Sequence, residues 1–126
     1  MSIPGWTFEY PAIDRVIARA DLDERHHTPF GVVHGGVYAW AVESACSAGA
    51  SAAVADQGMF AVGVNNSTDF LRTAVSERVE LVAFPVFQGR TQQLWQAEIA
   101  RERDGKLVAR GQLRLQNLPL GGRRQP

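Results

Sequence analysis

The sequence lacks several features that mark particular classes of protein. It has one cysteine, Cys46, so an intrachain disulfide is impossible. Its 13 basic and 13 acidic side chains leave no net charge, so no electrostatic attraction to nucleic acid or to a membrane surface is expected. It has no run of about 18 apolar residues that would span a bilayer, and its N-terminus, "MSIPGWTFEY", does not have the pattern of a secretory signal. We therefore expect a cytoplasmic protein that binds neither nucleic acid nor membranes.

The composition that remains is that of a soluble globular protein. Apolar residues make up 45% and charged residues 21% of the 126 positions, a length and balance that suit one domain with its own core. We expect this single domain to span residues 1–120. The last six residues, "GGRRQP", are expected to form a flexible C-terminal tail over 121–126.

The most distinctive segment begins at Gly35 and ends near Ala55. Every residue in it is apolar, small or hydroxylic except Glu43. Alanine, the best helix former, fills much of the segment, and the glycine of "DQG" follows it, so we predict one long helix. Because its apolar residues are not confined to one stripe, we expect the helix to be enclosed on several sides, as by a sheet wrapped around it.

Strand patterns dominate the rest of the chain and predict an α+β fold with an antiparallel sheet. Residues 1–11 show no clear period and form either a short strand or a lid. The "DG" dipeptide at Asp104-Gly105 predicts a two-residue hairpin turn. The predicted strands span 13–20 before the helix and 59–71, 77–87, 91–103 and 106–116 after it.

Glu43 is the only charged residue of the predicted helix, on the same face as Gly36, Trp40 and Ser47. A buried carboxylate without a partner costs on the order of several kcal/mol. Two interpretations are therefore open. Either Glu43 pairs with an arginine from a strand or points to solvent, or it takes part in chemistry.

The start of the predicted helix, His34-Gly35-Gly36, suggests a second half of a site. The first backbone amides of a helix have no intrahelical acceptor, and they lie at the positive end of its dipole, so they could hold a polarised carbonyl oxygen. The alternative is a plain glycine turn. Gly35 and Glu43 are eight residues apart, about 12 Å along a helix at ~1.5 Å per residue. They could act on one carbonyl only if a second chain supplied its Glu43, which predicts a homodimer with two shared sites.

Other candidate groups carry weaker signals. The three histidines, His26, His27 and His34, do not have the spacing of a metal site, so no metal and no other cofactor is expected. Cys46 is interpreted as a small buried apolar residue. Arg90, in a predicted turn, could reach a phosphate group or simply be solvated.

Three segments taken together carry a family resemblance: "PFGVVHGGVYAWAVESACSAGAS", "VGVNNSTDFLRTA" and "GRTQQLWQAEI". They resemble the acyl-CoA thioesterases of the hot-dog fold, in the branch related to Arthrobacter-type 4-hydroxybenzoyl-CoA thioesterase and the phenylacetate-pathway thioesterases. The resemblance extends from about Pro29 to Gln116. It implies a long central helix wrapped by a curved antiparallel sheet. It also implies a homodimer whose sheets join, often doubled to a homotetramer.

The resemblance also implies roles for single residues. Glu43 would be the catalytic carboxylate, as nucleophile or general base, and the N–H of Gly35 would polarise the thioester carbonyl. His34 would help to position the thioester, and Ser47 would assist the carboxylate or its water. Relatives often have glutamine where this chain has Thr28, and some have histidines around Phe70, which this chain lacks. The expected substrate-binding residues are Thr28, Phe30, Gly36, Trp40, Arg72 and Arg90, the two arginines matching positions near the CoA nucleotide.

The expected function is hydrolysis of an acyl-CoA thioester to a carboxylate and free CoA, with an aromatic or medium-to-long acyl group. CoA is then part of the substrate and not a cofactor. Two alternatives stay open at this point: a non-catalytic acyl-CoA-binding protein of the same fold, and a hydratase or dehydratase. Glu43 favours hydrolysis over binding alone, and dehydration would call for a histidine paired with a carboxylate in the helix.

Overall fold

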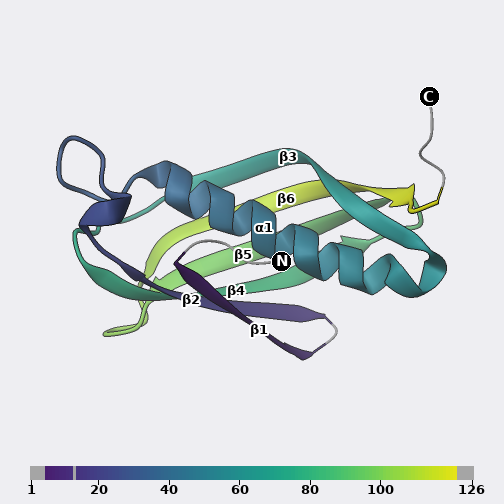
Figure 1. Ribbon diagram of the computed structural model, residues 1–126, viewed down its shortest axis with the longest axis horizontal. Coiled ribbons are helices and arrows are strands. Elements are labelled where there is room, and N and C mark those ends of the chain that lie inside the picture. Colours follow the sequence, from purple (N-terminus) through teal and green to yellow (C-terminus); the bar gives the residue numbers. More distant parts are fainter. Residues whose placement is uncertain (1–4, 13, 122–126) are drawn as a thin grey trace.

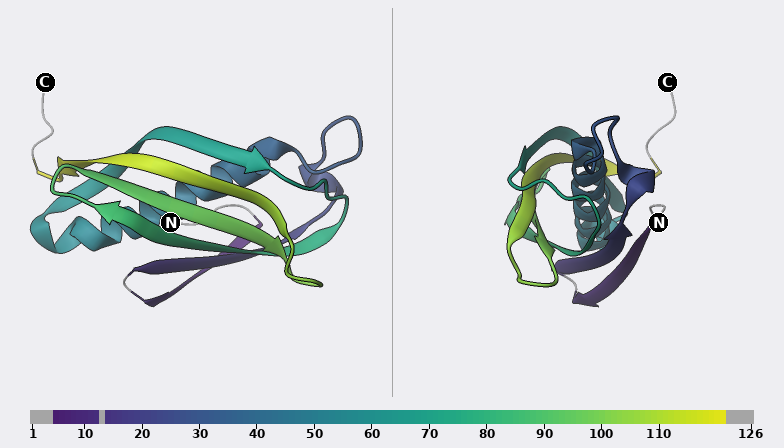
Figure 2. Two further views of the ribbon diagram at one scale, coloured as in Figure 1. Left: turned by 180° about the vertical axis from the view of Figure 1, so that it is seen from behind. Right: turned by 90° about the vertical axis from the view of Figure 1, so that its left-hand side faces the viewer.

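The computed structural model describes residues 5–12 and 14–121. Six strands form one antiparallel sheet in the order β1-β2-β4-β5-β6-β3, and the helix α1 lies against one face of it (Figure 1). The view along the helix shows the sheet curving round one side of α1 (Figure 2). The predicted α+β architecture is confirmed. The elements in chain order are β1 (Trp6–Ala12), β2 (Arg15–Leu22), η1 (Glu24–His26), α1 (Gly35–Val54), η2 (Ala55–Gln57), β3 (Met59–Phe70), β4 (Glu77–Gln88), β5 (Gln92–Arg101) and β6 (Leu107–Pro119).

The core lies between α1 and the concave face of the sheet. Alternation along β5 directs Trp95, Ala97 and Ile99 toward the helix, and all three are buried. The Trp95 ring lies directly against Gly49 of α1, where a Cβ atom would stand 2.6 Å from the ring. Glycine at position 49 therefore allows the helix to approach the largest buried side chain of the sheet.

A buried polar network fixes the far half of the helix to the sheet. The Gln93 side-chain amide donates to the Ala50 carbonyl at 3.0 Å and to the Asn117 side-chain oxygen at 2.8 Å. The Gln93 side-chain oxygen accepts from the Trp95 indole N–H at 2.8 Å. Such satisfied groups stabilise one arrangement of a core, because leaving any of them unpaired is costly. The network joins α1, β5 and β6.

Several boundaries differ from the sequence predictions. The described part of residues 1–11 is strand β1 and not a lid, and Ile13, the predicted start of the next strand, lies outside the described residues. The β5–β6 loop is longer than a two-residue turn, since the Arg101 amide donates to the Lys106 carbonyl. Gly105, with φ of 74°, ends this loop, while Asp104 accepts hydrogen bonds from the Arg101 side chain and the Lys106 amide. The "DG" pair thus belongs to a longer loop. Glycine is suited to position 105 there because it adopts a positive φ at little steric cost.

The prediction that a sheet wraps around α1 is confirmed, but the helix is not enclosed on every side of a single chain. The face that carries Gly36, Trp40 and Glu43 is exposed, and Trp40 keeps 49% of its surface accessible. The same small and apolar residue types therefore line both a covered and an uncovered face. In the described part of the chain, no helix is long and apolar enough to cross a membrane. The predicted tail, 121–126, lies outside the described residues except for Gly121.

Candidate active site

His34 caps the N-terminus of α1 and organises its first amides. Its Nδ1 accepts a hydrogen bond from the Gly36 amide at 2.8 Å, and its carbonyl accepts from the Val37 amide at 3.0 Å. The amide of Gly35 has no acceptor anywhere in residues 5–12 or 14–121. Of the two glycines proposed from the sequence to present open amides, Gly35 therefore keeps a free N–H group, whereas the N–H of Gly36 is used by the cap.

The end of β3 packs over this helix start. A Cβ atom at Gly35 would stand 2.8 Å from the ring of Phe70, so any other residue at position 35 would displace that ring. Phe70 itself is 56% exposed. A slot of about 180 Å³ opens here, lined by Val33, Gly35, Tyr38, Phe70, Leu71, Arg72 and Thr73. The free amide of Gly35 therefore lies beside a small cavity with aromatic and aliphatic walls.

Glu43 lies two turns further along α1, on the exposed face. Its Oε2 atom is 3.6 Å from the point where a Cβ of Gly63 would stand, so the carboxylate lies over a strand position that has no side chain. Within the described residues Glu43 makes no ion pair or hydrogen bond, so the interpretation that it pairs with a strand arginine is not supported. Ser47, one turn later, is partly exposed on the same face.

One chain does not bring Gly35 and Glu43 together. The whole interval between them is α-helix, so their backbones are about 12 Å apart at ~1.5 Å per residue. A reacting carbonyl must lie within roughly 3–3.5 Å of the group that attacks it. The two halves of the predicted site are therefore present, but each lacks its complement within the chain.

A larger groove, about 460 Å³, runs beside Trp40 on the other flank of the helix start. Part of its wall is η1, which Asp23 caps; hydrogen bonds from Arg25 lower the pKa of Asp23 to about 2. Trp40 and Val37 provide the apolar part of this groove. The lining residues are Gly5, Arg25, His26, His27, His34, Val37 and Trp40.

All three histidines have hydrogen bonds that shape the loop before α1. His26 Nδ1 accepts from the Asp23 amide at 3.1 Å, and His27 Nε2 lies 2.6 Å from the Val75 carbonyl, to which it donates. His34 caps the helix as described. No cluster of three or more histidine, cysteine, aspartate or glutamate side chains that could hold a metal occurs in the described ranges. Cys46 is buried, as predicted, and burial raises the pKa of its thiol to about 12.

The remaining predicted residues fall in separate places. Thr28 Oγ1 accepts from the Phe30 amide at 3.1 Å, so Thr28 shapes the turn that leaves Phe30 90% exposed. Arg72 lines the slot and donates to the Leu107 carbonyl at 2.7 Å. Arg90 belongs to the β4–β5 turn, where its carbonyl accepts from Asn117.

The two arginines lie at opposite ends of β6 in one chain. The Arg72 amide donates to Val108, and the Arg90 carbonyl accepts from Asn117, nine residues further along the strand. At ~3.3 Å per residue this separation is about 30 Å. The two arginines of one chain are therefore too far apart to bind one nucleotide together.

Comparison with known proteins assigns the family. The model of the thioesterase superfamily matches residues 30–108, which include Gly35, Glu43 and the slot. The chain belongs to the thioesterase superfamily. Rv1847 of Mycobacterium tuberculosis is 49% identical over 105 residues, which cover 80% of this chain and 74% of that protein. The 1,4-dihydroxy-2-naphthoyl-CoA hydrolase of Escherichia coli is 34% identical over 107 residues, covering 84% and 76%.

A solved thioesterase supports the same assignment. HI1161 of Haemophilus influenzae superimposes with a TM-score of 0.87 and 30% identity, covering 96% of this chain and 83% of that one. The hot-dog thioesterase fold expected from the resemblance is therefore confirmed, and this thioesterase is a thioester hydrolase. Sequence reasoning missed Tyr38 as a lining residue of the slot, because an aromatic residue in an apolar segment is usually part of the core. It missed Phe70 because nothing near that residue in the sequence shows that it packs against Gly35.

Proposed function

We propose that this thioesterase hydrolyses an acyl-CoA thioester to a carboxylate and free CoA, in active sites shared between two copies of the chain. The observation that carries the proposal is the state of Glu43. It is the only charged residue of α1, it is exposed, and it has no partner among the described residues. The same helix begins with a free Gly35 amide that Glu43 of its own chain cannot reach. The 1,4-dihydroxy-2-naphthoyl-CoA hydrolases among the relatives support a CoA thioester as substrate.

The chemistry requires only these groups and water. The Gly35 N–H donates a hydrogen bond to the thioester oxygen and stabilises the negative charge that develops there, an effect worth about 10²–10³ in turnover at comparable sites. As general base, Glu43 of the second copy takes a proton from water while the water oxygen bonds to the carbonyl carbon. The C–S bond then breaks, and the thiolate of CoA takes up a proton. As nucleophile, the carboxylate oxygen bonds to the carbonyl carbon itself, the C–S bond breaks, and CoA leaves as a thiolate that is protonated from water. Water then hydrolyses the anhydride, which releases the acyl carboxylate and restores Glu43.

The second copy is proposed to cover the exposed face of α1 and the free edge of β3. This surface includes Trp40, Val64 and Phe70, each about half exposed in one chain. Covering it with an antiparallel copy would set Glu43 of one chain opposite Gly35 of the other, because helices pack about 8–10 Å apart. Doubling of this homodimer to a homotetramer stays a prediction.

The other site residues are assigned by position. His34, as the cap, would orient the Gly35 amide, and Ser47 would hydrogen-bond the carboxylate or its water. We propose an aromatic acyl group over a medium-to-long chain, packed against Trp40 in the groove of about 460 Å³, since flat rings stack well on indole. Gly36, Thr28 and Phe30 would line its entrance. No cofactor is needed, and the cytoplasmic site of action stays a prediction.

The test is release of free thiol from a panel of aromatic and straight-chain acyl-CoAs. We expect wild type to cleave aromatic acyl-CoAs, and Glu43→Gln to lower turnover about 10²–10⁴-fold, the usual contribution of a general base. The melting temperature should not fall, because Glu43 has no intrachain contact to lose. Glu98→Gln, on the outer face of β5, is the matched control and should keep wild-type turnover. Tight acyl-CoA binding by wild type without thiol release would contradict the proposal.

A further inference from the structure

Tyr38 has a buried hydroxyl group without a hydrogen-bond partner. The side chain is 2% exposed, and its hydroxyl is the only buried side-chain nitrogen or oxygen in the described residues that lacks a partner. Leaving a buried donor unpaired destabilises a folded protein, and phenylalanine would fill the same space without that cost. No contact within the described residues explains why this position has a tyrosine and not a phenylalanine, so we look for a partner that is absent from the free chain.

The neighbouring carboxylate does not supply the partner. Glu77 is close enough to affect Tyr38 electrostatically, but its two oxygens accept from Arg103 at 3.1 and 3.2 Å. Burial, with a smaller effect from Glu77, raises the pKa of Tyr38 to about 12. The phenol is therefore protonated at neutral pH and has an O–H to donate.

Tyr38 lines the slot that also holds the free Gly35 amide. Arg72, an exposed cation, also lines the slot. The ring of Phe70 forms another wall: it lies against Gly35, and its centroid is 6.4 Å from that of Tyr38. Because the slot is walled by the Phe70 side chain, a rotation of that side chain would open it without moving the backbone.

The cation in its lining indicates which part of a substrate enters the slot. With the thioester carbonyl at Gly35, the acyl group and the CoA arm leave on different sides. Only the CoA arm carries phosphates, and Arg72 lines this slot. A cavity of about 180 Å³ suits a slender chain with an amide, and is too small for a nucleotide.

On the basis of the proposed function, we propose that the Tyr38 hydroxyl donates a hydrogen bond to the first amide carbonyl of the CoA arm, next to the sulfur. Tyr38 is then a substrate-binding residue that recognises the thiol half of the thioester, whatever the acyl group. Its hydroxyl is unpaired in the free protein because its acceptor arrives with the substrate.

The test compares Tyr38→Phe with wild type on three benzoyl thioesters. Benzoyl-CoA and S-benzoyl-N-acetylcysteamine contain the first amide, and S-propyl thiobenzoate does not. We expect kcat/KM to fall about 3- to 10-fold for the first two, the value of one hydrogen bond, and to stay unchanged for the third. The Kd for free CoA, measured by calorimetry, should rise by the same factor.

Stability gives an independent readout. Because Tyr38→Phe removes an unpaired hydroxyl, its melting temperature should equal or exceed that of wild type. Ser51→Ala is the matched control on the same helix: its hydroxyl is paired with the amide and the carbonyl of Ala61, so this variant should melt lower and keep its kinetic constants.

Three results would overturn the inference. They are a fall in melting temperature for Tyr38→Phe, an equal loss of kcat/KM on the propyl thioester, and no change on any thioester. If wild type cleaves none of the thioesters, the proposed function fails, and the Kd for CoA still decides the role of Tyr38.

Discussion

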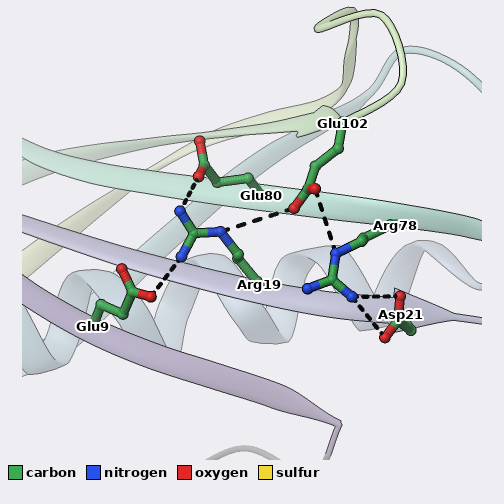
Figure 3. A network of polar contacts seen from close by, with 6 residues as sticks. All are labelled: Glu9, Arg19, Asp21, Arg78, Glu80 and Glu102. Atoms are coloured by element: carbon green, nitrogen blue, oxygen red, sulfur yellow. Dashed lines mark hydrogen bonds and ion pairs between the residues drawn. The ribbon is translucent and has the colours of Figure 1, made fainter.

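The two edges of the sheet differ in chemistry. At the β1 edge, Arg19 of β2 reaches Glu9 of β1 at 2.6 Å and Glu80 of β4 at 2.7 Å, and Arg78 extends the network to Asp21 (Figure 3). Hydrogen bonding to Glu9 raises the pKa of Arg19. At the β3 edge, Val64 and Phe70 are each 56% exposed.

The difference indicates which edge of the sheet contacts a second chain. An open strand edge can pair with another chain, and charged side chains are a common protection against such pairing. The β1 edge has this protection. The β3 edge carries one charged residue, the exposed Asp69, which has no ion pair among the described residues, and it presents Val64 and Phe70 next to the helix face that carries Glu43. Association of two copies at β3 and completion of the active site would then be one event.

The largest expected effect comes from mixing two inactive variants. Glu43→Gln lacks the carboxylate, and Gly35→Pro combined with Phe70→Ala lacks the amide proton while leaving room for the proline ring. Each homodimer should lose at least about 10²-fold in turnover. Heterodimers isolated with two affinity tags should recover about half of wild-type turnover, since one of their two shared sites is intact.

The comparison is sharpened by one control variant. Phe70→Ala alone keeps the Gly35 amide, so at concentrations where it is dimeric it should keep far more turnover than the double variant, which separates loss of the amide from loss of the ring. If each active site lay within one chain, both chains of the heterodimer would be inactive. Heterodimers as inactive as the two homodimers would therefore exclude the shared site.

A charge on the β3 edge should produce the next largest effect. Val64→Lys places an ammonium group in the proposed contact, and we expect the dissociation constant of the dimer to rise at least about tenfold. Turnover measured at low protein concentration should fall with it. Val86→Lys is the control, because Val86 is 54% exposed but lies on β4, away from the β3 edge. Sedimentation across a range of concentrations gives the measurement.

Two outcomes would move the contact elsewhere. One is an unchanged dissociation constant for Val64→Lys. The other is an equal rise for Val86→Lys, which would show a general effect of added charge. Either result would leave the β3 edge without the function that its apolar surface suggests.

Local patterns predicted the elements well, because their causes are local. Alanine content predicted α1, and strand patterns predicted β3, β4, β5 and β6 to within a few residues. The spacing of Gly35 and Glu43 predicted that one chain cannot join them, and the continuous helix agrees. The exposed face of α1 was not predicted, because small apolar residues look alike whether a sheet or a second chain is to cover them.

Features that depend on tertiary contacts were beyond the sequence. Nothing local shows that Phe70 lies over Gly35, since the two residues are brought together by the packing of β3 against α1. Tyr38 looks like an ordinary core aromatic until its hydroxyl is found without a partner. The separation of Arg72 from Arg90 likewise follows from sheet register, and spacing along the chain does not reveal it.

The smallest expected effect tests the β1 edge. Glu9→Gln removes one acceptor of Arg19, and because this pair is exposed to solvent, the melting temperature should fall by about 3 °C or less. The difference from wild type should vanish in 1 M salt, where the Debye length is about 3 Å. Turnover and dimer dissociation should not change, because Glu9 is at the edge opposite to β3. A change in the dissociation constant of the dimer for Glu9→Gln would mean that the β1 edge also contacts the partner. The β1 edge could then no longer be assigned to stability alone and the β3 edge to association.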